Sequence, residues 1–451
     1  MKAGAAATLD GNAKHEFILP ALLAELFNAF DRAFIDYNFC HDILNIERYS
    51  EFVMQEPAYN YCALPLAVYA CRPDQSQGRL FEEHESETRT PFQRDRDRII
   101  HSSAFRRLKY KTQVFVYHEG DHYRTRLTHT LEVSQIARTL ARALFVNEDL
   151  AETVALAHDL GHPPFAHVGE DALKACNKNY GGFNHNDQSL RVLTTLERKY
   201  PGWNGMNLTW ETLEGVVKHN GPYSGTITDT LQHIQSLTDL RLKSYASIEA
   251  QAAAIADDIA YNNHDLEDGL RAHFFTIDEL KDITLLRETL HNAQQKWPNI
   301  PQKILIQEVI RDMIGAMVTD VLRESQKRLQ DLNPQSVEDV RSASQQIVAF
   351  SDDMYQKVEE LRAFLWERVY THYTVMRMRK KATRIISDLY AAFMEEPALF
   401  PDNWQERLRE SGNEDDTNNR SRIVVDYIAG MTDRYAIKEH ERMFDLIWDL
   451  R

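Results

Sequence analysis

Histidine is concentrated in one part of the sequence. Eight of the 18 histidines fall between residues 101 and 185, which leaves ten for the other 366 residues. These eight are His101, His118, His122, His129, His158, His162, His167 and His185. Imidazole is the commonest metal ligand in proteins and titrates near neutral pH, so such a cluster is typical of metal binding and proton transfer. We therefore expect the chemistry of this protein to lie in this segment.

The adjacent pair His158 and Asp159 is the centre of the cluster. Neighbouring side chains on a helix point about 100° apart, so both can reach one ion only if it sits over a helix end. Gly161 and the pair Pro163-Pro164 follow directly and are expected to end the helix there, with Gly161 at the position after the C-cap. The sequence thus predicts a metal at the end of this helix.

The remaining ligands must come from neighbouring helices. His129, near the start of one predicted helix, and Asp257, near the end of another, meet that need. Two histidines and two carboxylates with open water positions suit Mn, Fe, Zn or Mg better than a closed structural zinc site would. Each residue also has an ordinary explanation: a chance His-Asp pair, a solvated helix end for Asp257 beside Asp258, or a capping or packing role for His129.

The elements that position these residues are predicted to be helices. Glycine and proline are sparse, at 17 and 14 residues, and no stretch alternates with period two, which favours an all-α protein. Apolar residues recur at helical spacing in 127–144, 147–160 and 247–262, with Asn147 as an N-cap. Further amphipathic windows at 304–329 and 351–389 predict a helical C-terminal region, with 411–420 as a loop between its last helices.

Three regions are proposed from this pattern: a partly helical N-terminal extension over residues 1–75 with a helix at 21–37, a core over 76–275, and a C-terminal helical region over 276–451.

The net charge of 52 − 68 = −16 argues against a dedicated duplex-DNA binder. The longest apolar stretch, 61–71, is too short for a membrane span, and the N-terminus lacks the apolar region of a secretory signal. The four cysteines, at 40, 62, 71 and 176, form neither a metal ribbon nor a disulfide framework, so we expect a reduced, cytoplasmic protein.

Several longer motifs accompany the proposed ligands in a fixed order. They are RTPFQRDRDRIIHSSAFRRLKYKTQV from Arg89, YRTRLTH from Tyr123, HDLGHPPFAHVGED from His158, GGFNHNDQS from Gly181 and LEGVVKHNGP from Leu213. Together with the order H…HD…D, they resemble the HD superfamily of metal-dependent phosphohydrolases, and within it the bacterial dGTP triphosphohydrolase-like proteins. The resemblance runs from about Leu64 to the C-terminus, and it implies an all-α, HD/PDEase-like helical core with additional C-terminal helices.

The resemblance also implies an activity. It is the metal-dependent hydrolysis of dNTPs, dGTP among them, to deoxynucleoside and inorganic triphosphate, by attack of a metal-activated water at the α-phosphorus. One divalent ion (Mn, Mg, Fe or Zn) and a homo-oligomer, a hexamer by resemblance, are implied as well. The alternatives are another HD phosphohydrolase, such as a nucleotidase or cyclic-nucleotide phosphodiesterase, and a nucleotide- or nucleic-acid-binding regulator without turnover.

Residue roles follow from the resemblance only where motifs match. The implied metal ligands are His129, His158, Asp159 and Asp257. The implied catalytic residues are His185 with Glu170 as its orienting acid, and His167, which like His162 would also lie on the substrate phosphates. The implied substrate-binding residues are Arg126, His162, Tyr261, Gln113 and, as a weaker match, Asp265, with Gln113 facing the sugar 3′ hydroxyl and Tyr261 near the sugar.

Elementary chemistry makes the proton-transfer pair reasonable. Attack at the α-phosphorus expels a nucleoside 5′ oxygen, which is a poor leaving group unless it is protonated. A histidine held by a carboxylate suits that role, because the carboxylate stabilises imidazolium and fixes the ring. His185 with Glu170 is therefore the preferred acid, and His167 is its rival.

Two basic segments need an explanation. Residues 94–126 hold nine basic and four acidic residues, a local charge of +5 beside the proposed metal, which suits a triphosphate pocket. The run Arg94–Arg98 is equally well explained as a solvated, self-paired helix face, and Arg126 is the better pocket residue.

The cluster of Arg377, Arg379, Lys380, Lys381 and Arg384 is expected to be an exposed helix face, with subunit contact, an allosteric nucleotide or single-stranded nucleic acid as the alternatives.

The beginning of the chain carries one further hypothesis. Residues 1–53 match nothing in the motifs above, and the similarity begins soon after Met54. We therefore expect the natural product to initiate at Met54, which an intact-mass measurement of the native protein would test.

Overall fold

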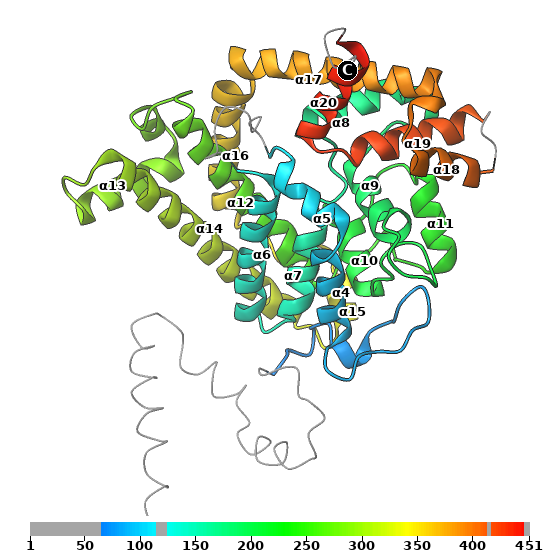
Figure 1. The fold of residues 1–451 in the computed structure, drawn as a ribbon. Coiled ribbons are helices and arrows are strands. Elements are labelled where there is room, and N and C mark those ends of the chain that lie inside the picture. The colour runs from blue at the N-terminus through cyan, green and yellow to red at the C-terminus, as the bar shows by residue number, and fades with distance from the viewer. Residues whose placement is uncertain (1–64, 114–123, 413–415, 446–451) are drawn as a thin grey trace, which may run out of the picture. The chain divides into compact units, whose positions relative to one another are not determined.

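The computed structural model of the chain describes residues 65–113, 124–412 and 416–445 (Figure 1). All regular structure within these ranges is helical, and pairing between extended segments there is limited to isolated bridges. The prediction of an all-α protein is therefore confirmed. The predicted helix at 21–37, Met54, His118, His122, Cys40 and Cys62 lie outside the described residues.

The helices of the first part of the chain surround the predicted site. They are α4 (Pro91–Ile100), α5 (Ser103–Arg107), α6 (Arg126–Ala143), α7 (Glu148–Ala157), α8 (Ala166–Cys176), α9 (His185–Arg191), η5 (Val192–Leu196), α10 (Trp210–Val217), α11 (Asp229–Leu237) and α12 (Ile248–Arg271). Short 3-10 turns lie at η1 (Pro73–Gln75), η2 (Leu108–Tyr110) and η4 (Lys178–Tyr180).

The later helices cover this group from two sides. They are α13 (Thr284–Lys296), α14 (Gln302–Leu332), α15 (Val337–Arg341), α16 (Asp352–Leu365), η7 (Trp366–Tyr370), α17 (Tyr373–Glu395), α18 (Asp402–Glu410), α19 (Thr417–Ala429) and α20 (Asp433–Phe444), with short turns η6 (Glu279–Asp282) and η8 (Pro397–Leu399). The predicted window 304–329 is a single helix, α14. The window 351–389 is not, because η7 and a bend separate α16 from α17.

Three apolar clusters hold the helices together. The largest joins α6, α7 and α12 to α13, α14 and α16, and a second lies among α5, α9, α10 and α11. The third packs α8 against α17, α18, α19 and α20 (Figure 1). As a result, the start of α6, the end of α7 and the middle of α12 lie close to the starts of α8 and α9.

Two local predictions are confirmed and two are wrong. Asn147 caps α7 by accepting a hydrogen bond from Leu150, and a helix begins just after position 247 as predicted. However, α12 runs on to Arg271, so Asp257 lies in the middle of a helix and not near its end. The position of Gly161 after a C-cap is also wrong, since α7 already ends at Ala157.

Gly161 is required for a different reason, which is close packing. A Cβ atom at this position would lie 2.2 Å from the backbone N of Ser189 and 2.3 Å from the carbonyl O of His185. The Gly161 N–H also donates to Ser189 Oγ at 2.9 Å. The glycine thus lets the turn after His158-Asp159 press directly against α9, which carries His185.

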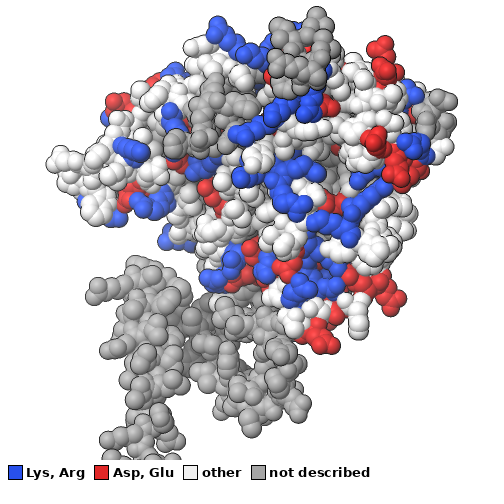
Figure 2. Space-filling view, in the orientation of Figure 1, with Lys and Arg blue, Asp and Glu red and all other residues white. Residues whose placement is uncertain are grey.

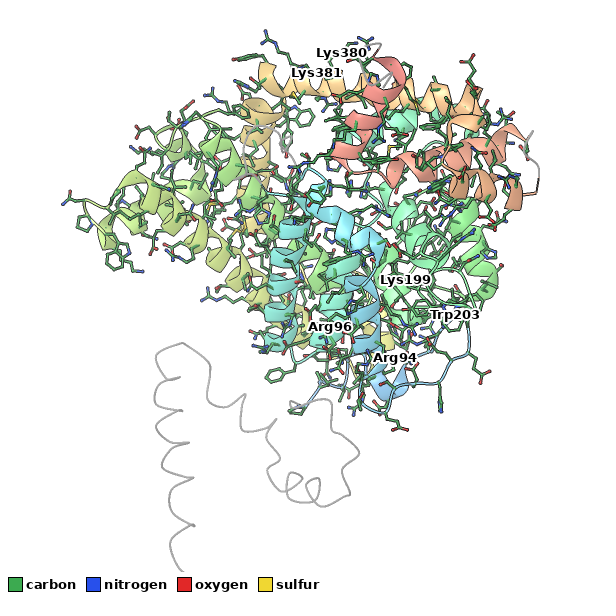
Figure 3. The ribbon with its side chains drawn as sticks, viewed as in Figure 1. Arg94, Arg96, Lys199, Trp203, Lys380 and Lys381 are labelled. Atoms are coloured by element: carbon green, nitrogen blue, oxygen red, sulfur yellow. The ribbon has the colours of Figure 1, made fainter. Side chains whose placement is uncertain are left out.

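The arginines of α4 have structural partners that neither sequence interpretation of them predicted. Arg94 and Arg98 both bind Glu83, at 2.9 and 2.6 Å, and Arg96 binds Asp149 at 2.7 Å. These partners come from other segments, and the one pair within the run, Arg96 with Asp97, is longer at 3.7 Å, so the arginines are mainly paired outside the run. The expectation that the +5 segment lines the pocket is therefore wrong for Arg94, Arg96 and Arg98, because their charge is already neutralised. Figure 3 labels Arg94 and Arg96 beside α4.

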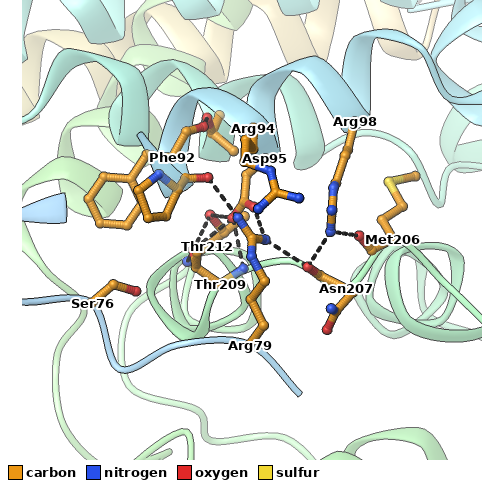
Figure 4. Close-up of polar contacts among 12 residues, drawn as sticks. Ser76, Arg79, Phe92, Arg94, Asp95, Arg98, Met206, Asn207, Thr209 and Thr212 are labelled. Carbon is orange, nitrogen blue, oxygen red and sulfur yellow. Dashed lines mark hydrogen bonds and ion pairs between the residues drawn. The ribbon is translucent and has the colours of Figure 1, made fainter. Parts of the chain in front are cut away.

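Asp95 is the buried centre of the network drawn in Figure 4. It accepts hydrogen bonds from Thr209 N and Oγ1 at 2.8 and 2.7 Å and from Thr212 Oγ1 at 2.8 Å, and it pairs with Arg79, whose side chain is only 3% exposed. Replacing Asp95 with alanine leaves these donors and the Arg79 charge without their buried acceptor. We expect a loss of about 3 kcal/mol in the free energy of unfolding, measured by urea denaturation.

Asp97→Ala is the matched control for this stability prediction. Its carboxylate is 29% exposed and pairs with Arg89, which is 50% exposed, and such surface pairs contribute only about 0–1 kcal/mol. Equal losses of unfolding free energy in the two variants would show that burial of Asp95 does not increase its contribution to stability.

Two findings concern membrane spans and disulfide bonds. Among the described residues, no helix has the length and apolar character needed to cross a bilayer. Cys71 and Cys176 are free thiols, so no disulfide joins the two cysteines that the structure describes.

Candidate active site

Three of the predicted metal ligands meet where α6 faces the end of α7. His129 lies one turn into α6, which starts with a Thr125 capping box, while His158 is the C-cap of α7 and Asp159 follows it. Ligand atoms of His129, His158 and Asp159 all lie within 4.8 Å of one another, and all three residues are buried. This is the helix-end arrangement that the His-Asp pair predicted.

Asp257 completes the group from α12. Its Oδ1 lies 2.9 Å from His129 Nε2 and 3.6 Å from His158 Nε2. The structure therefore brings all four predicted ligands together, from two helices and one interhelical turn.

The donor atoms fit a divalent cation. The Nδ1–H of His158 donates to the carbonyl of Ala155 at 2.6 Å, which leaves Nε2 as a lone pair directed at the cluster. This Nε2 and Asp159 Oδ2 are both buried without a hydrogen-bond partner. Buried polar atoms are rarely left unpaired, so two such atoms beside two further ligands mark a place for an ion.

The carboxylates of the group are held in the charged form. Burial alone raises the pKa of Asp159, but Arg126 and His158 outweigh it and hold that pKa well below the ordinary value. Burial likewise acts on Asp257, where His158 and His129 outweigh it and lower the pKa. Ionised carboxylates are what a hard divalent ion requires.

Arg126 holds one carboxylate oxygen of Asp159 in place. Its Nη1 forms an ion pair with Asp159 Oδ1 at 2.7 Å, and the residue is 1% exposed. His162 Nε2 lies 3.2 Å from the same oxygen, so Oδ1 is occupied while Oδ2 remains free. The predicted substrate contact of Arg126 stays a prediction; in the structure this arginine pairs with the proposed metal ligand Asp159.

Two histidines that the sequence analysis did not assign lie directly against the ligands. His219 Nε2 is 3.3 Å from Asp257 Oδ2, and its ring stacks on His158 with centroids 5.3 Å apart. His264 Nδ1 is 3.1 Å from His129 Nδ1, and its other ring nitrogen pairs with Glu132. Each therefore fixes the orientation of a ligand, as outer partners in metal sites do.

A sequence signal for His264 existed. Asp257, Tyr261, His264 and Asp265 follow at i, i+4, i+7 and i+8, which places all four on one face of a helix. His219 lies in the motif LEGVVKHNGP, but nothing in its spacing relates it to His158 or Asp257.

The predicted proton-transfer residues form a second group beside the first. The His185 ring, at the start of α9, places Nδ1 2.9 Å from both carboxylate oxygens of Glu170 on α8. Glu170 also accepts from the His185 backbone N at 3.0 Å, and His167 Nδ1 lies 3.4 Å from it. Burial opposes ionisation of Glu170, but His167 and His185 outweigh it and lower the pKa.

The two groups touch through His162. Its ring stacks on that of His185 with centroids 3.9 Å apart and an interplanar angle of 16°. Since His162 also binds Asp159, one imidazole links the proposed acid to a proposed metal ligand. Burial and the Arg126 charge lower the pKa of His162 well below its ordinary value, so this link is neutral.

A third group lies further along α12. The hydroxyl of Tyr370, in η7, contacts both the Tyr261 hydroxyl and the Asp265 carboxylate. Asp265 Oδ1 is buried without a partner, and burial raises the pKa of Asp265 to about 8. Tyr370 was missed by the sequence analysis, because it lies 105 residues after Asp265 and belongs to none of the quoted motifs.

Gln113 is buried at the end of a described range, and its Oε1 has no hydrogen-bond partner. No hydrogen bond joins it to Tyr261 or Asp265 among the described residues, so its position opposite a sugar hydroxyl remains a prediction. His101 is exposed and lies in neither histidine group.

The basic cluster on α17 is largely exposed. Arg379 pairs with Asp171 at 3.3 Å and Arg384 with Asp388 at 3.4 Å, while Lys380 and Lys381 project from the helix (Figure 3). This agrees with the exposed helix face that the sequence predicted.

Comparison with known proteins adds family evidence to this geometry. Residues 126–262 match the HD domain, and residues 348–442 match a phosphohydrolase-associated domain. The deoxyguanosinetriphosphate triphosphohydrolase-like protein of Bradyrhizobium sp. (strain ORS 278) is 51% identical over 389 residues, which is 86% of this chain and 99% of that protein. The protein of the same description from Caulobacter sp. (strain K31) is 53% identical over 391 residues, covering 86% of this chain and 98% of its own.

A solved structure of a hypothetical protein from Aquifex aeolicus is also similar. The identity is 19%, the TM-score is 0.28, and the match covers 70% of this chain and 78% of the other. A likeness of this size supports no conclusion about function.

Proposed function

The chain belongs to the family of deoxyguanosinetriphosphate triphosphohydrolase-like proteins, and we propose that this HD-domain phosphohydrolase cleaves dNTPs, dGTP among them, to deoxynucleoside and inorganic triphosphate. The observation that carries the proposal is the contact between its two histidine groups. A histidine–carboxylate pair, His185 with Glu170, lies against His162, which binds the proposed metal ligand Asp159. A group that moves a proton thus sits beside a group that holds an ion.

The metal ligands would be His129, His158, Asp159 and Asp257. An ion bound by them, Mn, Mg, Fe or Zn, would polarise a phosphoryl oxygen and lower the pKa of water from 15.7 toward about 7. The chain's own residues prepare this site. Arg126 holds Asp159 through Oδ1, Ala155 O fixes the tautomer of His158, and His264 fixes that of His129.

His185 is the proposed general acid. Its Nδ1 is held by Glu170, so Nε2 is the atom that carries a proton to the departing 5′ oxygen. The ionised Glu170 stabilises the imidazolium form and fixes the ring. His162 and His167 are proposed to contact the phosphates, and Tyr261, Gln113 and Asp265 are proposed to surround the sugar.

Product analysis tests the proposal. Purified protein is incubated with each of the four dNTPs and with Mn²⁺, Mg²⁺, Fe²⁺ or Zn²⁺ in turn, and the products are separated by ion chromatography. Release of inorganic triphosphate in equal amount to deoxynucleoside is expected. In parallel incubations with dNMPs and cyclic nucleotides, release of orthophosphate or opening of the cyclic ester, without hydrolysis of dNTPs, would instead identify another HD phosphohydrolase, and binding of dNTPs without turnover would identify a regulator.

We also propose that the protein is cytoplasmic and homo-oligomeric, with a hexamer as the state that the resemblance implies. Light scattering of the purified protein tests the oligomer, and a monomer at micromolar concentration would contradict it. Single-stranded nucleic acid remains a candidate partner only for the exposed basic cluster on α17.

Tyr370→Phe tests the proposed sugar side of the site. The variant removes the hydroxyl that joins Tyr261 to Asp265 and keeps the ring. We expect kcat/KM for the preferred dNTP to fall by up to about tenfold, since a hydrogen bond between neutral groups contributes about 0.5–1.5 kcal/mol. Tyr355→Phe, at a tyrosine that is 54% exposed, is the control. If the two variants have the same kcat/KM, the Tyr370 hydroxyl does not contribute to binding the sugar.

A further inference from the structure

The segment 162–166, which we call the α8 turn, has a strained backbone. Phe165 and Ala166 have φ values of 65° and 54°, in the left-handed region that residues other than glycine seldom adopt. Such residues persist only where the surrounding structure holds them, and they cluster at functional sites. The α8 turn begins at His162 and leads directly into α8, which carries His167 and Glu170. What holds this turn therefore also positions the proposed catalytic residues.

A carboxylate from the far end of the chain binds the α8 turn. Asp433, the first residue of α20, accepts the Phe165 N–H through Oδ1 at 2.9 Å. Its Oδ2 accepts the Thr112 N–H at 3.0 Å and also the Thr112 hydroxyl. Burial raises the pKa of Asp433, and the hydrogen bonds from Thr112 and Phe165 oppose that rise. One buried carboxylate thus ties α20 both to the α8 turn and to the segment that precedes α6.

Lys111 binds the other end of the same turn. Its Nζ donates to the carbonyl of His162 and, at 2.8 Å, to that of Ala429, the last residue of α19. The final carbonyls of a helix have no partner within that helix, so Lys111 satisfies a group that α19 leaves open. Burial lowers the pKa of Lys111 well below its ordinary value, but a neutral amine still donates two hydrogen bonds.

Both groups lie away from the charged surface of the molecule. Figure 2 shows Lys, Arg, Asp and Glu side chains over one face, whereas Lys111 is 2% exposed and Asp433 is 1% exposed. Burying such groups is unfavourable unless they are hydrogen-bonded, and the contacts with the α8 turn supply part of that compensation. The side chains and the turn therefore hold one another in place.

The segment that carries Lys111 also contacts the start of α6. Thr112 forms an antiparallel bridge with Thr125, and the Arg126 N–H donates to the Lys111 carbonyl at 3.0 Å. Thr125 caps α6, and His129 lies one turn into this helix. Lys111 and Asp433 thus connect α19 and α20 with both the α8 turn and the start of α6. We call this set of contacts the clamp.

His162 is the side chain through which the clamp can affect the site. Its ring stacks on His185 with centroids 3.9 Å apart, and its Nε2 lies 3.2 Å from Asp159 Oδ1. Close packing adds to the constraint, since a Cβ at Gly169 would lie 1.9 Å from the Pro164 carbonyl O. A shift of the His162 backbone would move the ring that joins the proposed proton-transfer group to the proposed metal group. A misplacement of about 1 Å can cost about 10²-fold in rate.

We propose that Asp433 and Lys111 are positioning residues for the hydrolysis proposed above. They hold the α8 turn in its strained form, and through the turn they fix His162 between the two histidine groups. The inference rests on the proposed function and extends the groups that support the reaction to the junction of α19 and α20, 268 residues after Phe165.

Asp433→Asn tests the clamp while keeping the shape of the side chain. Its amide nitrogen must face the N–H of either Phe165 or Thr112, so a hydrogen bond is lost. We expect kcat for the preferred dNTP to fall by about tenfold to 10²-fold. The metal content should stay full, because the lost contacts are with Phe165 and Thr112 and not with the proposed ligands. Lys111→Met, which keeps the length of the side chain, is expected to give a similar loss.

Tyr390→Phe is the matched control. The Tyr390 hydroxyl donates to Asn177 Oδ1 at 2.9 Å, a buried hydrogen bond that also joins the C-terminal helices to α8, but at the end of α8 opposite the turn. Its kcat is expected to stay within about twofold of the parent value. The urea midpoint of each variant is measured as well, so that a loss of stability is separated from a loss of rate.

A second substitution tests the strain itself. Ala166→Gly removes the Cβ that disfavours a positive φ, so in the Asp433→Asn background it should raise kcat by at least about threefold. In the parent chain the same change is expected to alter kcat by less than about twofold, since the clamp already holds the turn. A purely structural role of Asp433 predicts no such recovery of rate.

Hydrogen exchange of the peptide covering residues 160–170 provides a readout that needs no substrate. Exchange is expected to be at least about tenfold faster in Asp433→Asn than in the parent chain, and unchanged in Tyr390→Phe, because only the first variant frees the turn.

Four outcomes would each overturn the proposal: unchanged exchange at 160–170 in Asp433→Asn, a parent-like kcat in that variant, an equal loss of kcat in Tyr390→Phe, or no recovery with Ala166→Gly. Failure of the parent chain to release triphosphate from any dNTP would instead contradict the proposed function, and the exchange measurement distinguishes the two failures.

Discussion

Asp257→Asn is expected to remove the bound divalent ion and to lower kcat by at least about 10³-fold, since metal catalysis contributes several kcal/mol to transition-state stabilisation. The substitution keeps the shape of the side chain but replaces a charged oxygen that lies 2.9 Å from His129 Nε2 and 3.6 Å from His158 Nε2. A neutral amide is a poor ligand for a hard ion. Metal content is measured by mass spectrometry of the purified protein, and activity by release of inorganic triphosphate.

The adjacent residue supplies the control for this experiment. Asp258 pairs with Arg362 at 2.8 Å, and its side chain is 51% exposed. Asp258→Asn is expected to retain the metal and to keep kcat within about threefold, because a surface ion pair is worth about 0–1 kcal/mol. Full metal content and full activity in Asp257→Asn would show that the four-residue group is not the metal site.

His185→Asn is expected to lower kcat by about 10²–10⁴-fold, the usual contribution of a general acid. The asparagine amide can still donate to Glu170, as His185 Nδ1 does at 2.9 Å, so the contact between α9 and α8 is kept. What is lost is the proton carried on Nε2. The metal content should therefore remain full, which separates this variant from Asp257→Asn.

The dependence of the rate defect on the leaving group tests the acid role of His185 more directly. If His185 protonates the departing oxygen, the defect of His185→Asn should shrink for an aryl triphosphate ester, whose leaving phenol is acidic and needs little protonation. Glu170→Gln should show the same trend with a smaller defect, because Glu170 acts through His185.

His167→Asn distinguishes the rival acid. Its side chain is 55% exposed and lies 3.4 Å from Glu170, compared with 2.9 Å and 23% exposure for His185. We expect a loss of less than about tenfold, consistent with one phosphate contact. A larger, leaving-group-dependent loss in His167→Asn than in His185→Asn would transfer the acid role to His167.

The sequence by itself determined the helical class, several helix boundaries and which four residues come together as the proposed metal ligands. Asn147 and the HD pair are local signals, because a cap and a helix end depend on residues that lie within one or two turns. The proposed proton-transfer group was also readable, since His162, His167, Glu170 and His185 belong to two neighbouring motifs. In each case the information lay in short spacing or in an ordered set of motifs.

Only the tertiary structure decided which residues stand behind these groups. His219 reaches Asp257, and Tyr370 reaches Asp265, across 38 and 105 residues of sequence. Arg94 and Arg98 form no pocket because Glu83, from a separate segment, already binds them. Such contacts depend on how helices pack, and packing is set by the fit of apolar faces distant in the chain, which no local spacing records. The proposed ligands could therefore be named from the sequence, whereas their supporting partners could not.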